Sequence, residues 1–133
     1  MFKSFMFSMF VLFFLFISSV NAEDFSFTFE WGNIPLCNTG SPNRVPNPIF
    51  TLSGVPEGTK KIKFKMVDKM SPYNHGGGTV QYSGQKVIRP GAFKYDSPCP
   101  PGSVHTYVWT ATALGKGMMG RAKASKKYPE KGK

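Results

Sequence analysis

The chain has 133 residues, and its 17 lysines and arginines against seven aspartates and glutamates give a formal net charge of +10 at pH 7. This length supports one compact domain with a single core and excludes an architecture of several domains. The positive charge favours anionic partners such as lipid headgroups, surface glycans or nucleic acid.

Residues 1–22 have the pattern of a signal peptide. Lys3 supplies a positive charge, residues 5–20 are mostly apolar, and Val20-Asn21-Ala22 forms a small-residue cleavage site. The alternative is a membrane anchor, because the segment approaches the lower length limit for a spanning helix. We expect cleavage, since the apolar core is short and the cleavage site follows it at once. The remaining domain, residues 23–133, is then periplasmic or secreted and has no stable membrane span.

The first half of this domain predicts strands joined by loops. Residues 24–30 alternate phenylalanine with polar residues, which is typical of a half-buried strand. Residues 31–48 are rich in glycine, asparagine and proline and predict a loop. Residues 61–67 alternate apolar residues with three lysines, which predicts a strand with one solvated face. A dedicated anion-binding stripe is the alternative interpretation of these lysines.

The second half predicts two further strands and a helix. Residues 79–82 indicate a short strand, and residues 104–114 are β-branched, aromatic or small and predict the longest strand. Glycines at 115 and 117 end that strand. Residues 118–127 then predict a short helix with exposed basic side chains.

A stiff turn precedes the longest strand. Pro98, Pro100 and Pro101 each fix φ and lack a backbone N–H, so this segment cannot lie inside a sheet or a helix. In the strand that follows, His105 and Tyr107 share one face, because alternate side chains of a strand point the same way. A stiff loop beside an imidazole and a phenol can bind a small polar or anionic group. The alternative is a turn that caps a strand whose histidine and tyrosine are core residues.

The chain contains two cysteines, Cys37 and Cys99. An even number of cysteines in an exported chain predicts a disulfide. The alternative is a nucleophilic Cys99 paired with His105, which a disulfide would abolish.

The segment Ser97-Pro98-Cys99-Pro100-Pro101, followed by His105 and Tyr107, resembles a signature of the phosphatidylethanolamine-binding protein family, whose bacterial members are Raf kinase inhibitor protein-like. Residues 53–60, Ser-Gly-Val-Pro-Glu-Gly-Thr-Lys, are similar to a second motif of that family. Residues 68–72 fall where the family has Asp-Pro-Asp-x-Pro and keep only the first acid, Asp68. We therefore identify the chain as resembling a reduced and divergent member.

The resemblance implies a mainly β fold, a small antiparallel β-sandwich-like domain with a short C-terminal helix. It also implies an exported, non-catalytic binding protein for a small anion or a phosphorylated group such as a phospholipid headgroup. An extracytoplasmic inhibitor or modulator of another protein, kinase- or protease-inhibitor-like, is the alternative. The predicted ligand-binding residues are Asp68, Gln81, Cys99, Pro100, Pro101, His105 and Tyr107, with His75 as an accessory residue.

Gln81 stands where the family has a histidine when the two are aligned through Gly77 and Gly78. A glutamine amide can donate a hydrogen bond to a phosphate oxygen, but it cannot carry charge.

A hydrolase using Asp68 and His105 is the weakest interpretation. The sequence has two histidines, no Gly-x-Ser-x-Gly, no Cys-x-x-Cys and no cluster with metal-ligand spacing. We therefore expect no enzymatic activity, no cofactor and no metal. We also expect no nucleic-acid partner, because no motif supports one and the chain is predicted to be exported.

Overall fold

The computed structural model describes residue 17 and residues 23–130. The predicted signal peptide, residues 1–22, therefore lies almost wholly outside the described residues. Of the residues described, none form a helix that is long and apolar enough to cross a membrane. The strands are β1 (Ser26–Glu30), β2 (Arg44–Pro46), β3 (Ile49–Ser53), β4 (Lys61–Asp68), β5 (Asn74–Gln81), β6 (Val87–Ile88), β7 (Lys94–Asp96), β8 (His105–Gly115) and β9 (Gly117–Tyr128).

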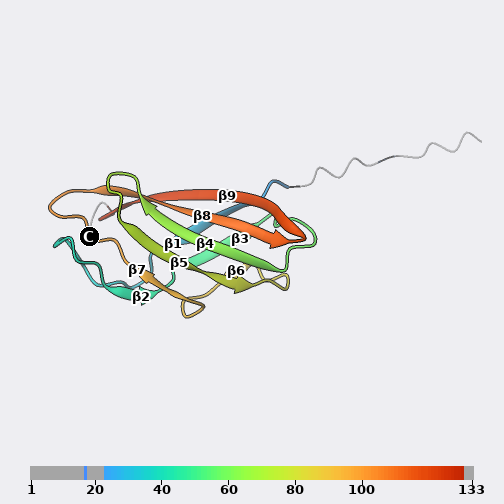
Figure 1. The fold of residues 1–133 in the computed structure, drawn as a ribbon, viewed down its shortest axis with the longest axis horizontal. Coiled ribbons are helices and arrows are strands. Elements are labelled where there is room, and N and C mark those ends of the chain that lie inside the picture. Colours follow the sequence, from blue (N-terminus) through green and yellow to red (C-terminus); the bar gives the residue numbers. More distant parts are fainter. Residues whose placement is uncertain (1–16, 18–22, 131–133) are drawn as a thin grey trace, which may run out of the picture.

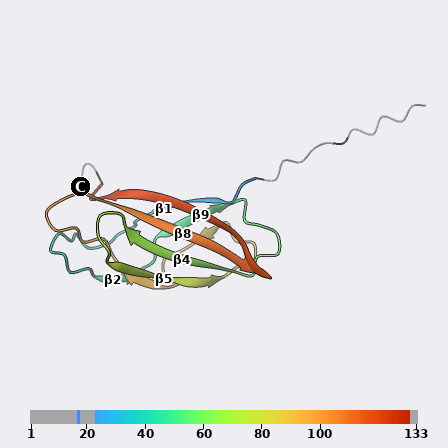
Figure 2. The same ribbon diagram turned by 45° about the horizontal axis from the view of Figure 1, so that its top comes forward.

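The strands form three antiparallel groups. A four-stranded sheet has the order β5-β4-β8-β9, a three-stranded sheet has the order β1-β3-β6, and β2 pairs with β7. Figure 1 shows β5, β4, β8 and β9 side by side with β1 and β3 behind them, and Figure 2 shows the same strands after a 45° turn. The prediction of a mainly β, antiparallel domain is confirmed.

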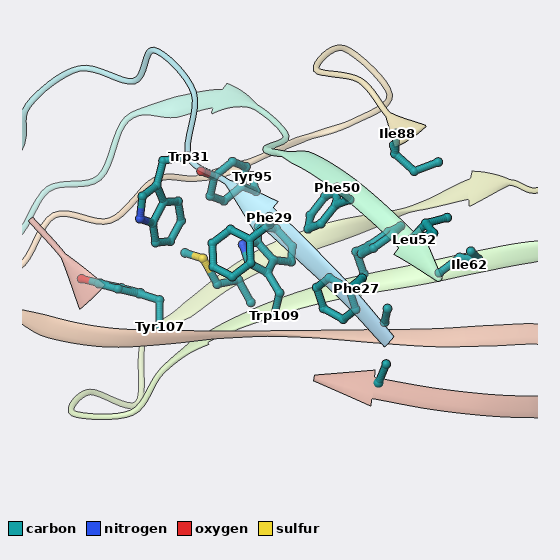
Figure 3. Packing of buried hydrophobic residues seen from close by; sticks show 14 of the residues in the cluster. Phe27, Phe29, Trp31, Phe50, Leu52, Ile62, Ile88, Tyr95, Tyr107 and Trp109 are labelled. Atoms are coloured by element: carbon teal, nitrogen blue, oxygen red, sulfur yellow. The ribbon is translucent and has the colours of Figure 1, made fainter. Parts of the chain in front are cut away.

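Aromatic side chains fill the space between the two larger sheets. The Phe50 ring of β3 stacks on the Phe64 ring of β4 with their centroids 4.2 Å apart, and it meets the Trp109 ring of β8 edge-on at 5.2 Å. Figure 3 shows the rings of Phe50 and Trp109 beside those of Phe27 and Phe29 of β1. The alternation expected in β4 is present, since Ile62, Phe64 and Met66 are buried and the three lysines are exposed.

The predicted C-terminal helix is wrong, because residues 118–127 belong to β9. This strand pairs with β8 from His105 opposite Tyr128 to Gly115 opposite Gly117. Alanine and lysine favour helices in isolation, but here pairing with a neighbouring strand overrides that preference. Small side chains alternate with basic ones along β9, so Ala122 is buried while its neighbours Arg121 and Lys123 are exposed. Gly117, with φ of 77°, allows the tight turn back from β8.

Tyr95 of β7 carries a buried hydroxyl group. Its side chain is fully buried, and its hydroxyl has no hydrogen-bond partner among the described residues. Burial raises the pKa of Tyr95 well above its ordinary value of 10.0, with a smaller contribution from Tyr128. The folded state therefore keeps this phenol neutral.

Tyr95→Phe is expected to leave the free energy of unfolding at pH 7 unchanged or to raise it by up to about 1 kcal/mol, because it removes an unpaired buried hydroxyl. Below pH 10 the phenol is neutral in both the folded and the unfolded chain. As the pH rises above 10 the unfolded chain loses this proton first, so the stability of the wild type falls. Chemical denaturation at pH 7 and pH 10.5 should show a smaller alkaline loss for Tyr95→Phe than for the control Tyr82→Phe. An equal loss in both variants would contradict this prediction.

Candidate ligand-binding site

A pocket of about 170 Å³ lies where β4 ends and where β5 and β8 begin. Asp68, the last residue of β4, pairs across the sheet with Tyr107 of β8, and His75 lies near the start of β5. The loop that carries Cys99 closes the pocket from the side. The lining residues are Gly40, Pro42, Asp68, Ser71, Tyr73, His75, Cys99, Pro100, Pro101, His105 and Tyr107.

A buried hydrogen bond to Asp68 orients the imidazole of His105. The Nδ1 atom of His105 lies 2.6 Å from Oδ2 of Asp68, and both side chains are largely buried. The other carboxylate oxygen, Oδ1, accepts a hydrogen bond from the backbone N–H of Met70 at 2.8 Å. Because an ionised carboxylate only accepts, Nδ1 of His105 donates, and Nε2 is the ring nitrogen left for a ligand. Both oxygens of Asp68 therefore serve to position other groups.

His75 forms part of the pocket wall. Its side chain is buried, and Nδ1 lies 2.7 Å from the backbone carbonyl oxygen of Asp96. A carbonyl oxygen only accepts, so this Nδ1 carries the proton and Nε2 is again the free ring nitrogen. The ring meets the Tyr107 ring edge-on with centroids 5.3 Å apart. The sequence predicts His75 only as an accessory residue, whereas the structure buries it beside Tyr107 in the pocket wall.

Tyr107 contributes a phenol to the lining of the pocket. Its pKa is raised above its ordinary value of 10.0, first by burial and then by the negative charge of Asp68, while a backbone hydrogen bond at Cys99 acts in the opposite direction. The phenol is therefore neutral at physiological pH and can donate a hydrogen bond. Trp31 packs edge-on behind it at 5.9 Å, which holds the ring in place (Figure 3).

The loop beside these side chains is fixed at several points. The predicted disulfide between Cys37 and Cys99 is present, with Cα atoms 4.5 Å apart. The backbone N–H of Ser97 donates to the carbonyl of Asn43 at 2.9 Å, and Pro98 and Pro100 are fully buried. With its sulfur in a disulfide, Cys99 cannot serve as a nucleophile.

Gln81 is not part of this pocket, contrary to the prediction. It is exposed at the opposite end of β5, where it pairs with Lys61 and its backbone carbonyl accepts a hydrogen bond from the Gln85 side chain. Six residues of extended strand, about 20 Å, separate it from His75. The alignment through Gly77 and Gly78 therefore pointed to a residue at the end of β5 that lies away from the pocket.

A sequence signal for His75 does exist. Asp68 ends one strand and His75 comes seven residues later, a spacing that fits a hairpin whose second strand returns past the end of the first. The structure has this hairpin, with Val67 opposite Asn74. Ser71 and Tyr73 lie in its connecting loop and also line the pocket, and sequence reasoning missed both.

The pocket can present several hydrogen-bond donors to a ligand. The Tyr107 phenol and the Ser71 hydroxyl can donate directly, whereas each imidazole uses its Nδ1 proton within the protein and donates from Nε2 only when that nitrogen is protonated. The Asp68 carboxylate in the lining is already paired. Within the described part of the chain, no group of three or more His, Cys, Asp or Glu side chains is arranged to hold a metal ion.

A scan against protein-family models found no match, and a search of curated proteins also found none. Among solved structures, the chain is similar to a proposed phosphatidylethanolamine-binding protein homologue from Chlamydia trachomatis D/UW-3/CX. The TM-score is 0.48 and the identity is 15%, and the match covers 80% of this chain and 98% of that chain. This similarity concerns the fold.

Proposed function

We propose that this protein is an exported binding protein that holds a small anion, phosphate or a phosphorylated headgroup, in the pocket around His105. The observation that carries the proposal is the buried Asp68–His105 pair, which fixes one imidazole beside a second imidazole and a neutral phenol. The Cys37–Cys99 disulfide supports a periplasmic or secreted location, because such bonds persist in oxidising compartments.

The donor set suits an oxyanion. When His105 is protonated, its charge and that of Asp68 cancel, so the pair itself does not repel an anion. A second proton on His75 would make the pocket positive, and the Tyr107 hydroxyl adds a neutral donor. The net charge of +10 on the whole chain also raises the local concentration of anions.

The size of the pocket restricts the ligand. Its volume of about 170 Å³ is below the roughly 300–1,000 Å³ of pockets that enclose drug-sized molecules. We infer that a phosphate-sized group enters and that any lipid chain attached to it stays outside. The proline-stiffened, disulfide-linked loop lowers the entropy that binding would otherwise cost.

A binding function without catalysis fits the pocket better than a hydrolase does. Cys99 is held in the disulfide, and Ser71 is the serine that lines the pocket. In the described chain no hydrogen bond joins Ser71 to His105; its Oγ accepts instead from the backbone N–H of Tyr73 at 3.3 Å. Nucleophilic catalysis needs a base in contact with the nucleophile. Incubation with p-nitrophenyl esters and phosphates should therefore give no turnover above buffer, and turnover abolished by Ser71→Ala would overturn this part of the proposal.

Titration with inorganic phosphate, followed by NMR, is expected to shift the resonances of His75, His105 and Tyr107. His105→Gln keeps an amide donor beside Asp68 but removes the imidazole, and we expect it to weaken phosphate binding at least about tenfold, the loss of one charge-assisted hydrogen bond. Gln81→Ala is the matched control at an exposed position outside the pocket and should leave the affinity unchanged. Phosphoethanolamine and sulfate, titrated in parallel, distinguish a headgroup site from a general oxyanion site. Equal weakening by Gln81→Ala and His105→Gln would contradict the proposal.

One observation favours a second candidate function, that of a modulator of another protein. Three apolar side chains next to the pocket segments are exposed: Met70 at 63%, Tyr73 at 44% and Val104 at 52%. Exposed apolar side chains that gather around a pocket favour a protein interface. Under this function Met70→Ser with Val104→Ser would abolish partner binding while phosphate binding persists.

A further inference from the structure

The outer face of the four-stranded sheet carries two matched rows of basic and hydroxyl side chains. In one row Lys63 of β4, Thr112 of β8 and Arg121 of β9 lie side by side. In the next row the same three strands contribute Lys65, Thr110 and Lys123. The basic side chains of both rows are exposed. Each row therefore places a cation on either side of a threonine.

These rows form a groove of about 550 Å³ that runs along β8. Its two sides are formed by basic side chains of β4 and β9, and its floor is formed by β8, the strand between them. The lining residues are Lys63, Lys65, Thr110, Thr112, Leu114, Met118, Arg121 and Lys123. The two basic sides are two strand spacings apart, about 9.5 Å, and cations on one side repeat every 6.6–6.8 Å or so along the strand. The groove is thus long and narrow enough to hold a single extended chain.

Within the described residues, no acidic side chain pairs with the cations of the groove. Strands β4, β5, β8 and β9 contain one acidic residue, Asp68, and it is buried and faces the core. The ion pairs among the described residues use Arg44, His105 and Lys126, and none of them involves a groove cation. These cations lie about 7 to 10 Å apart, within a Debye length of about 10 Å at 0.1 M salt, so they repel one another. A linear polyanion lying in the groove would remove this repulsion.

We propose that this groove binds an acidic polysaccharide, a linear glycan that carries carboxylate or sulfate groups. Its anionic groups would pair with the basic sides, and its hydroxyls would hydrogen-bond to Thr110 and Thr112 on the floor. None of the described residues that line the groove is aromatic, and single-stranded nucleic acid relies on such side chains for base stacking. The apolar side chains in this lining are Leu114 and Met118, which offer a bilayer little surface to cover. The site lies on the opposite face of the sheet from the phosphate pocket and does not depend on it.

Heparin, a sulfated glycan, is the probe for this groove, and dextran is the uncharged control. The groove variant combines Lys63→Gln, Arg121→Gln and Lys123→Gln. The matched control combines Lys86→Gln, Arg89→Gln and Lys94→Gln, which removes the same three charges from exposed positions elsewhere. Calorimetry at about 0.1 M salt should show heparin binding at least about tenfold weaker for the groove variant and within about threefold of wild type for the control, because only close charges contribute strongly at that ionic strength. Dextran should not bind.

Three results would overturn the proposal. An equal loss of heparin binding in both variants would mean that net charge alone is responsible. Tighter binding to a single-stranded 20-mer DNA or to vesicles of anionic phospholipid, lost in the groove variant, would mean that the occupant is a different polyanion. Heparin-induced NMR shifts confined to His105 and Tyr107, with none at Thr110 and Thr112, would assign the binding to the phosphate pocket instead. Thermal unfolding of both variants checks that each remains folded.

Discussion

Replacing Cys37 and Cys99 together by serine is expected to lower the free energy of unfolding by about 4 kcal/mol. The disulfide joins residues 62 positions apart, and closing a loop of that length removes a large part of the conformational entropy of the unfolded chain. A domain of this size has roughly 5–15 kcal/mol of total stability, so the loss is a large fraction of it. The same change frees the loop that carries Cys99 and Pro100, so we also expect weaker phosphate binding at temperatures where the variant is still folded.

Denaturant unfolding with and without a reducing agent measures this effect. Wild type should lose stability on reduction, whereas the serine variant should not change further. A difference below about 1 kcal/mol between oxidised and reduced wild type would contradict the prediction, since it would mean that the loops are held by their packing alone.

Asn47→Ala is expected to lower the free energy of unfolding by about 3 kcal/mol, because it leaves several buried polar groups without partners. The side chain of Asn47 is buried. Its Oδ1 accepts hydrogen bonds from three consecutive backbone N–H groups, those of Gly91, Ala92 and Phe93, at 3.1, 2.9 and 3.1 Å. Its Nδ2 donates to the carbonyls of Pro48 and Arg89 at 2.8 and 3.0 Å. One amide therefore ties the start of β3 to the loop before β7.

Two variants make this prediction specific. Asn47→Asp keeps an acceptor for the three N–H groups but loses both donors, so its stability should fall between those of wild type and Asn47→Ala. Asn38→Ala removes an exposed asparagine and should change the free energy of unfolding by less than about 0.5 kcal/mol. If Asn47→Ala is as mild as Asn38→Ala, the amide does not hold the two segments together.

Some of the site could be predicted because the signals are local. The three prolines at 98, 100 and 101 fix the backbone wherever they occur, and His105 and Tyr107 follow two positions apart on one strand. Asp68 could be predicted as the residue that ends an alternating strand. The structure brings these residues into one pocket, and the reason is the pairing of β4 with β8, which places Asp68 opposite Tyr107.

Other features depended on contacts that no local pattern contains. Residues 118–127 have the composition of a helix, and only pairing with β8 makes them a strand. Once that strand is in place, Arg121 and Lys123 lie across Thr112 and Thr110 from the lysines of β4, and the lysine face becomes one side of a groove. In the same way, β5 folds back along β4 so that its first residues lie beside the end of β4. This pairing brings His75, and not Gln81, close to Asp68.

Local patterns were enough to predict the β class, the alternation of β4, the stiff turn before β8 and the cysteine pair, because each depends on backbone preferences or on an even number of cysteines. Contacts in the folded chain fix which histidine reaches the pocket, that the C-terminal segment is extended, and where the uncompensated positive charge gathers. The physical reason is that strand pairing joins residues far apart in the chain, and its free energy outweighs the local preference of any short segment.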